Sequence, residues 1–171
     1  MTMNPMRDVR VEKVTLNVGC GKDQTRLDKG VLLLKNITGV DPVKTFTNKR
    51  IPDWGLRPGL PIGCMITIRK QHANQLLARL LEAKDHKMKD TWFDKEGNFS
   101  FGIHEYIDIP SVKYDPKVGM MGLEVCVTLE RKGYRIKKRT FKKKKIPARH
   151  RVSKEDATNF MIKTFKVSMV E

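Results

Sequence analysis

Apolar and polar residues alternate along several stretches of the chain. In residues 9–18, every second position from residue 14 onward carries an aliphatic side chain, with a threonine and an asparagine between them. The same alternation recurs in residues 62–69 and 123–129. Such stretches predict strands with one apolar and one polar face, because successive side chains of a strand point to opposite sides. The polar face of the first two strands is predicted to carry Thr15, Asn17, Thr67 and Arg69.

Three helices are predicted from apolar residues at helical spacing. Residues 25–38 and 71–83 carry leucines and other apolar side chains three or four positions apart. The third helix begins after Ser153, a residue suited to cap a helix, and acidic residues occupy its first turn. Residues 103–109 carry isoleucines that predict part of a further strand, closed by Pro110.

Strands with a single apolar face form antiparallel sheets that are covered on one side only. The three helices can supply that cover. We therefore predict the α+β class: a two-layer fold with an antiparallel sheet, helices on one face and an open RNA-binding face. The length of 171 residues suits a single domain. We expect this domain to span residues 1–171, with a long loop at 48–61 and a basic extension at 131–151.

The basic extension carries most of the net charge. The chain has 35 Lys and Arg against 19 Asp and Glu, a formal net charge of +16. Twelve of the basic residues fall within residues 131–151, where there is no acidic residue. Like charges at this density repel one another, so the segment is not expected to pack stably by itself. A polyanion would relieve the repulsion, and the release of its counterions would drive binding.

Nucleic acid and an anionic membrane are the two polyanions to compare. A membrane-surface helix needs an apolar face, and residues 131–151 hold only four large apolar side chains. The longest apolar run of the chain, residues 31–34, is far too short to span a bilayer. The pattern favours nucleic acid with no membrane partner, and a solvated loop without a specific partner is the minority alternative. The candidate phosphate contacts are Arg135, Lys137, Lys138, Arg139, Lys142, Lys143, Lys144, Lys145, Arg149 and Arg151.

The loop at residues 48–61 combines cations with an aromatic ring. It holds three cations beside Trp54, and Asp53 is the one opposing charge. Cations beside an exposed aromatic side chain suit a sugar-phosphate backbone or an unstacked base. The alternative is that Trp54 only pins the loop to the core, and the sequence leaves both interpretations open. The three cations are Lys49, Arg50 and Arg57.

No residues in the sequence form a recognisable catalytic or metal-binding pattern. The four histidines and three cysteines are scattered without ligand spacing, and the cysteines are expected to be buried apolar side chains. The turn at residues 19–22 lacks the spacing of a nucleotide-binding loop. We therefore predict no cofactor, no metal and no enzymatic activity. An RNA-processing or RNA-modifying enzyme is the alternative function.

Three motifs lie far apart along the chain: residues 11–19 (VEKVTLNVG), 57–64 (RPGLPIGC) and 97–105 (GNFSFGIHE). In their residues, order and spacing they resemble motifs of the ribosomal protein L5 family. The similarity covers about residues 4–167. The short start of the chain and residues 148–157 (ARHRVSKEDA) resemble the archaeal and eukaryotic branch of the family.

This resemblance implies a structural role in the large subunit of the cytoplasmic ribosome. Members of the family bind 5S rRNA through the open sheet face and attach it to the large rRNA in the central protuberance. They also approach the P-site tRNA with the long loop, adjoin neighbouring ribosomal proteins, and help to bridge to the small-subunit head. Carried over by position, the 5S-facing residues are Thr15, Asn17, Thr67 and Arg69, and the tRNA-proximal residues are Asn48, Lys49, Arg50, Trp54 and Arg57.

Overall fold

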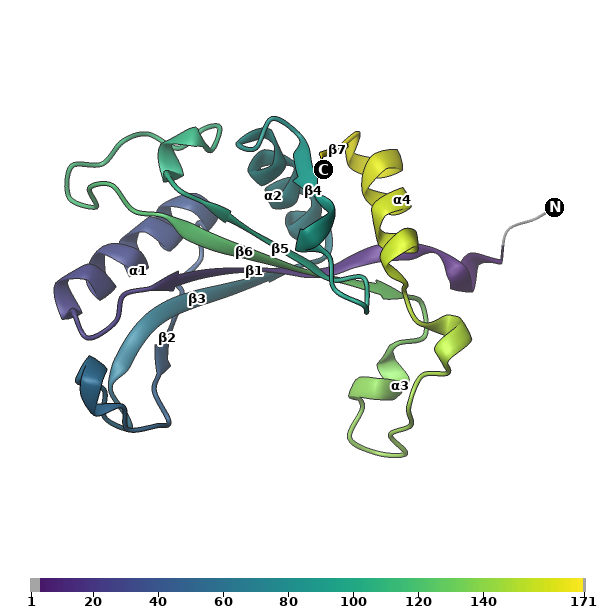
Figure 1. The fold of residues 1–171 in the computed structure, drawn as a ribbon, viewed down its shortest axis with the longest axis horizontal. Helices are drawn as coiled ribbons and strands as arrows, with labels where there is room; N and C mark the ends of the chain where they lie inside the picture. The colour runs from purple at the N-terminus through teal and green to yellow at the C-terminus, as the bar shows by residue number, and fades with distance from the viewer. Residues whose placement is uncertain (1–3, 171) are drawn as a thin grey trace. The chain divides into compact units, whose positions relative to one another are not determined.

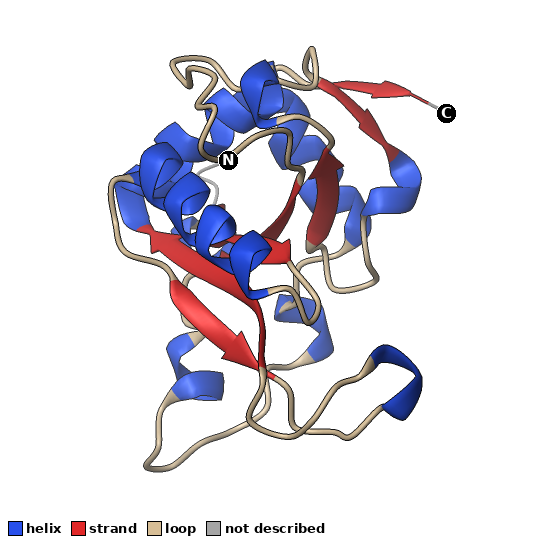
Figure 2. Cartoon of the chain, turned by 90° about the vertical axis from the view of Figure 1, so that its left-hand side faces the viewer, coloured by secondary structure: helices blue, strands red, loops and turns tan. Residues whose placement is uncertain are grey.

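A computed structural model describes residues 4–170, and residues 1–3 and 171 of the predicted domain lie outside this range. The helices are α1 (Gln24–Thr38), α2 (Lys70–Glu82), α3 (Arg135–Lys138) and α4 (Lys154–Phe165) (Figure 1). The strands are β1 (Val9–Gly19), β2 (Val43–Phe46), β3 (Pro61–Arg69), β4 (Lys87–Lys89), β5 (Phe99–Ile103), β6 (Leu123–Arg131) and β7 (Ser168–Val170). Loops and short helical turns connect these elements (Figure 2).

Five strands form one antiparallel sheet in the order β2-β3-β1-β6-β5. The register of the β2–β3 pair sets Val43 opposite Met65. The strands β4 and β7 form a separate parallel pair. The predicted α+β class is confirmed. The β4–β7 pair and α3 are not predicted from the sequence, because elements of three or four residues are too short to show a hydrophobic period.

Burial alternates along the central strands as the sequence predicts. Leu16 and Val18 of β1 and Ile66 of β3 are buried, as are the apolar positions of β6. Between them, Thr67 is exposed and Thr15 is half-buried. One side of these strands therefore belongs to the core, and the other side is an open face in contact with solvent.

The described chain forms two compact units. Unit 1 comprises residues 4–14, 69–100 and 127–170, and unit 2 comprises residues 15–68 and 101–126. The boundaries fall within β1, β3, β5 and β6, so each unit contains part of the sheet. The single domain predicted from the chain length stays a prediction.

In unit 2, α1 packs closely against β1 and β3. A Cβ atom placed on Gly30 would lie 3.0 Å from Cys64 Sγ and 3.3 Å from Cys20 Sγ, which is closer than ordinary van der Waals contact. Burial raises the pKa of the Cys64 thiol to about 12, so this side chain stays protonated as a small apolar group. The Asp23 carboxylate caps α1 by accepting hydrogen bonds from two backbone N–H groups of the first turn.

In unit 1, α2 and α4 supply most of the apolar cover. The helix α2 buries four leucines and one alanine on a single stripe. Ser153 caps α4 as predicted, because its hydroxyl accepts a hydrogen bond from the backbone N–H of Asp156 and the Asp156 carboxylate accepts one from Ser153 in return. The same carboxylate lies 2.7 Å from the buried Arg131 guanidinium, which ties α4 to the end of β6. The buried residues of α2 are Ala73, Leu76, Leu77, Leu80 and Leu81.

The strand predicted over residues 103–109 is wrong beyond Ile103. The strand β5 ends at that residue, and Tyr106–Asp108 forms a single helical turn. The Tyr106 side chain is buried, and its hydroxyl accepts a hydrogen bond from the backbone N–H of Asp115 at 3.0 Å. Burial of this large ring and its hydroxyl overrides the alternation of isoleucines that suggested a strand.

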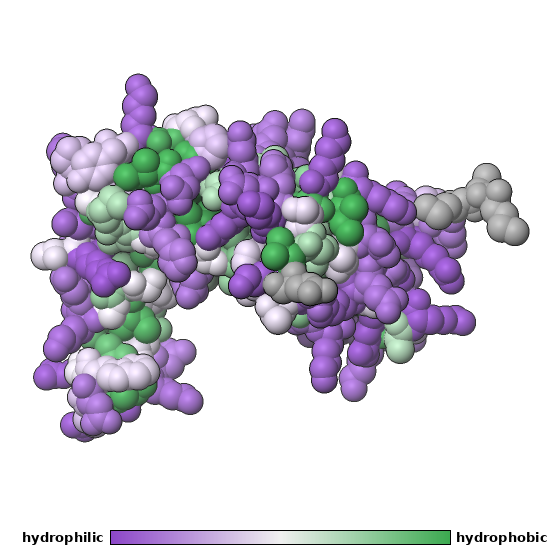
Figure 3. All heavy atoms as spheres, turned by 45° about the horizontal axis from the view of Figure 1, so that its top comes forward, coloured by the Kyte–Doolittle hydropathy of each residue, from purple (hydrophilic) through white to green (hydrophobic). Residues whose placement is uncertain are grey.

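Hydrophilic side chains dominate the face of the molecule in Figure 3, with smaller apolar areas between them. Large apolar side chains that are exposed include Phe46, Trp54 and Phe141. Among the helices within residues 4–170, none is long and apolar enough to cross a lipid bilayer.

Candidate nucleic-acid interface

Three of the four predicted 5S-facing residues lie in unit 2 and form lateral pairs on the open face. The hydroxyl oxygens of Thr15 and Thr67 are 3.3 Å apart on the neighbouring strands β1 and β3. The Asn17 amide donates a hydrogen bond to Glu124 Oε2 on β6 at 3.2 Å. Hydroxyl and amide groups can make further hydrogen bonds beyond these. This part of the face therefore offers neutral donors and acceptors suited to base edges and ribose hydroxyls.

Glu124 is a member of this surface that the sequence reasoning did not single out. Its exposed carboxylate repels phosphate groups, so this part of the face does not suit a phosphate backbone. Cys126 is exposed two residues further along β6, so the expectation that all three cysteines are buried is wrong here. Val125 and Val127 are buried on either side of Cys126, so the alternation of β6 places the Cys126 side chain on the exposed face.

Arg69 belongs to unit 1 and makes a different contact. Its Nη1 atom lies 3.0 Å from Glu12 Oε1, and the side chain remains 55% exposed. A guanidinium carries five N–H donors, so Arg69 can hold Glu12 and still present donors to a phosphate. The prediction places Arg69 with the three neutral residues, whereas in the structure its partner is a carboxylate.

Glu12 and Glu130 are nearly buried carboxylates that the sequence reasoning missed. Each side chain is 11% exposed. Lys138 of α3 lies 2.6 Å from Glu12 and 2.8 Å from Glu130, and Arg10 lies 2.7 Å from Glu130. Burial acts to raise the pKa of Glu12, but hydrogen bonds from Lys138 and Arg69 outweigh it and hold that pKa below its ordinary value. These five residues are called the carboxylate cluster below.

The carboxylate cluster attaches the basic extension to the other segments of unit 1. Lys138 supplies one attachment and the buried side chain of Ile146 supplies a second, and the buried Val152 anchors the chain directly after the extension. The Tyr134 hydroxyl accepts a hydrogen bond from the backbone N–H of Val152 at 2.9 Å. This bond joins the start of the extension to the residue that follows its end. The extension therefore does not rely on its own residues alone, because acids from other segments of unit 1 offset part of its charge.

The ten predicted phosphate contacts fall into two groups. Lys137 lies 3.9 Å from Glu96, and Lys138 is paired within the carboxylate cluster, so acidic neighbours partly neutralise these two cations. Eight others are exposed, and in the described part of the chain no carboxylate lies within 4.0 Å of their charged groups. They are Arg135, Arg139, Lys142, Lys143, Lys144, Lys145, Arg149 and Arg151.

The long loop is a closed turn between β2 and β3 in unit 2. The backbone N–H of Thr47 donates to the carbonyl of Leu60 at 3.0 Å, and the N–H of Gly59 donates to the Thr47 carbonyl at 2.9 Å. Leu56 is 8% exposed, whereas Trp54 is 66% exposed. The interpretation that Trp54 pins the loop to the core is therefore wrong, because Leu56 does so and Trp54 faces solvent. The other candidate residues of the loop, Asn48, Lys49, Arg50 and Arg57, are exposed as well.

Together these features define a class of protein: a small, basic α+β protein with an open polar sheet face and a cationic extension. That combination is typical of proteins that bind folded RNA. Across residues 4–170, no group of three or more His, Cys, Asp and Glu side chains is placed to hold a metal ion.

Comparison with protein families agrees with the motifs. A family model described as "Ribosomal protein L5" matches residues 4–57, and one described as "ribosomal L5P family C-terminus" matches residues 61–160. The chain belongs to the ribosomal protein L5 family, as its three motifs predict. This is a family of structural ribosomal proteins rather than enzymes, so the alternative of an RNA-processing enzyme is wrong.

Individual relatives are similar over nearly the whole chain. The "Large ribosomal subunit protein uL5" of Sulfurisphaera tokodaii is 46% identical over 171 residues, covering 99% of this chain and 97% of that protein. The protein with the same name from Nanoarchaeum equitans is 51% identical over 154 residues, covering 90% of each chain. The one from Methanobrevibacter smithii is 42% identical over 168 residues, covering 98% of this chain and 99% of that protein. These archaeal relatives agree with the predicted branch of the family.

Proposed function

We propose that this chain joins 5S rRNA to the large rRNA in the central protuberance of the ribosome. It is a structural constituent of the large ribosomal subunit, as the names of its relatives indicate, and it is located in the ribosome in the cytoplasm. The observation that carries the finer proposal is that each unit carries a different kind of surface. Neutral hydrogen-bonding groups occupy the open face of unit 2, and unpaired cations occupy the basic extension of unit 1.

Each surface suits a different part of the RNA. Thr15, Asn17 and Thr67 present hydroxyl and amide groups, which can recognise base edges and ribose hydroxyls of 5S rRNA. Arg69 adds one cation that is held in place by Glu12. The eight exposed cations of the basic extension, which have no acidic neighbour, suit the phosphates of the large rRNA.

The long loop is proposed to approach the P-site tRNA and the bridge to the small-subunit head, next to other proteins of the central protuberance. An exposed indole at Trp54 lies in a loop with the exposed cations Lys49, Arg50 and Arg57. This composition suits a sugar-phosphate backbone. Ultraviolet cross-linking of large subunits that carry P-site tRNA tests the contact. Cross-links to this loop are expected, and their absence would contradict the contact.

A mobility-shift assay tests the central proposal. The full chain is titrated at moderate salt against 5S rRNA, a tRNA and a random RNA of the same length as 5S rRNA. Tighter binding to 5S rRNA than to the other two RNAs is expected, because a shaped hydrogen-bonding surface discriminates among folds where cations alone do not. Equal affinity for all three RNAs would contradict 5S recognition.

A further inference from the structure

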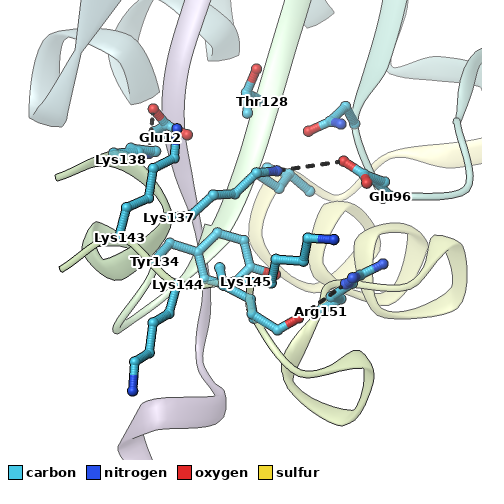
Figure 4. Close-up of a pocket in the computed structure, with 13 residues that line it drawn as sticks. Glu12, Glu96, Thr128, Tyr134, Lys137, Lys138, Lys143, Lys144, Lys145 and Arg151 are labelled. Carbon is cyan, nitrogen blue, oxygen red and sulfur yellow. Dashed lines mark hydrogen bonds and ion pairs between the residues drawn. The ribbon is translucent and has the colours of Figure 1, made fainter. Parts of the chain in front are cut away.

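A cavity of about 880 Å³ lies in unit 1 between the basic extension and the sheet (Figure 4). Its walls come from β1, β6, the turn before β5, and residues 134–151. Volumes of this size are typical of sites for small organic ligands. Six cations and two carboxylates line the walls, so the cavity favours an anionic ligand.

Both carboxylates of the lining lie at one end of the cavity, where cations pair with them, and further cations lie towards the opposite end. Figure 4 shows Glu12, Thr128 and Glu96 at one end, and Lys144 and Arg151 towards the other. The carboxylates at the first end have cationic partners of their own, because Lys138 pairs with Glu12 and Lys137 lies near Glu96. A phosphate group is therefore attracted to one end only, and the other end suits a neutral polar group.

The cationic end is built by the backbone and is not a chance meeting of flexible side chains. The backbone N–H of Lys144 donates to the Ile136 carbonyl at 3.2 Å, and the Arg139 guanidinium donates to the Lys142 carbonyl at 3.0 Å. Ile146, which follows the lysine run, is buried. These contacts fix the path of residues 142–146. Lys145 and Arg151 line this end, and they have no carboxylate within 4.0 Å in the described chain, so their charges are available to a ligand.

An aromatic ring lies between the two ends. The Tyr134 hydroxyl accepts a hydrogen bond from the backbone N–H of Val152 at 2.9 Å and donates one to the His150 carbonyl at 3.3 Å. These bonds hold the ring in one orientation, and Figure 4 shows it in the middle of the lining cations. A fixed ring beside lysines is the combination on which proteins stack an unpaired base while they hold its phosphate.

The wall beyond the ring carries groups that can reach the edge of a base. The Thr128 hydroxyl both donates and accepts hydrogen bonds. The Asn98 amide nitrogen donates to Asp94 Oδ2 at 2.9 Å, which leaves the amide oxygen as an acceptor. The cavity therefore contains, in order, a phosphate end, a stacking surface and a hydrogen-bonding wall.

We propose that this cavity receives one unpaired nucleotide of an RNA strand. The phosphate is held between Lys145 and Arg151, the base stacks on Tyr134, and the base edge faces Thr128 and Asn98. The inference rests on the proposed role in binding RNA, and it adds a distinct requirement: this site needs an unpaired nucleotide and does not accept a continuous duplex.

Binding of short RNA probes to the full chain tests this inference. The probes are a fluorescein-labelled eight-residue oligouridylate and a 20-base-pair RNA duplex. Tyr134→Leu is expected to weaken oligouridylate binding by about 5- to 150-fold, the equivalent of about 1–3 kcal/mol for one stacked base. Tyr134→Phe is the matched control, because it loses the same hydroxyl contacts but keeps the ring. Equal effects of the two variants, or an equal loss of duplex binding by Tyr134→Leu, would overturn the inference.

A second measurement uses the unaltered protein, so it does not depend on the folding of a variant. Oligouridylate that carries 4-thiouridine is photo-cross-linked to the chain, and the modified peptides are mapped by mass spectrometry. Cross-links are expected at Tyr134, Thr128 or Asn98. Cross-links confined to exposed aromatic residues outside the cavity, such as Phe141 or Trp54, would overturn the inference.

The two proposals can fail separately. If the chain shows no preference for 5S rRNA but ring-dependent binding of oligouridylate persists, the 5S proposal fails and the nucleotide site stands. If the preference for 5S rRNA persists and oligouridylate binds Tyr134→Leu as it binds Tyr134→Phe, the nucleotide site fails and the 5S proposal stands.

Discussion

The Lys138 ammonium lies 2.6 Å from Oε1 of Glu12, so a cation of the basic extension is paired with a nearly buried carboxylate on the sheet. The same ammonium reaches Glu130 at 2.8 Å. This contact offsets part of the charge of a segment that has twelve basic residues and no acidic residue. The two acids that pair with Lys138 come from β1 and β6 rather than from the extension itself.

Replacing Glu12 with Gln is expected to lower the free energy of unfolding by about 1–3 kcal/mol. The amide keeps the shape of the side chain but removes the charge that faces Lys138 and Arg69. Urea unfolding followed by circular dichroism measures the change. Glu96→Gln is the matched control, because Glu96 is exposed and lies 3.9 Å from Lys137, so its loss is expected to cost less than about 0.5 kcal/mol. Equal costs for the two variants would show that the carboxylate cluster does not fasten the extension.

The same carboxylate predicts how stability depends on pH. The pKa of Glu12 in the folded chain lies below its ordinary value of 4.5, so the unfolded chain binds this proton more tightly. The charged side chain therefore stabilises the fold at neutral pH, and this contribution is lost as the pH falls from about 4.5 through the folded-state pKa. Urea midpoints measured between pH 7 and pH 3 should fall less steeply for Glu12→Gln than for the wild type. Parallel curves would contradict the assignment.

Local patterns predict the sheet and its open face, but not the contacts that join distant segments. Alternation in β1 and β3 identifies Thr15 and Thr67 as polar positions, and both lie on the open face. Glu12 is a polar residue of the same strand, but its pairing with Lys138 depends on how the chain folds back, which no local period contains. A signal does exist: Val11 and Val14 are both buried, and this break in the period of two falls at Glu12.

The anchoring of the long loop is also a contact that local patterns do not predict. Its composition predicts cations and an aromatic ring, but not which apolar side chain anchors it. Leu56→Ala is expected to lower the free energy of unfolding by about 2–5 kcal/mol, because a buried leucine is removed. Trp54→Ala is expected to change it by less than about 0.5 kcal/mol, since this ring is 66% exposed. Thermal or urea unfolding of both variants measures the two losses of stability. A larger loss for Trp54→Ala would show that Trp54, and not Leu56, anchors the loop.

Removal of the neutral groups on the open face is expected to weaken binding to 5S rRNA. Asn17→Ala combined with Thr67→Ala should cost about 1–3 kcal/mol in a mobility shift, because each side chain loses a hydrogen bond to RNA. The matched control combines Asn159→Ala with Thr91→Ala, two exposed residues on α4 and in the turn after β4. Unchanged 5S binding by the first pair, or the same loss for both pairs, would place the 5S site elsewhere.

Replacing Lys142, Lys143, Lys144 and Lys145 with Gln is expected to change the salt dependence of RNA binding more than its selectivity. These exposed cations have no acidic neighbour in the described chain, so each can release counterions from a phosphate. The slope of log K against log salt should become shallower by about 3, since each phosphate contact contributes about 0.7–0.9. The control replaces four exposed lysines of other segments with Gln, which gives the same change in net charge: Lys29, Lys95, Lys113 and Lys117. Binding measured from low to moderate salt separates the two variants, and identical slopes would mean that the run at residues 142–145 stays in solvent when RNA binds.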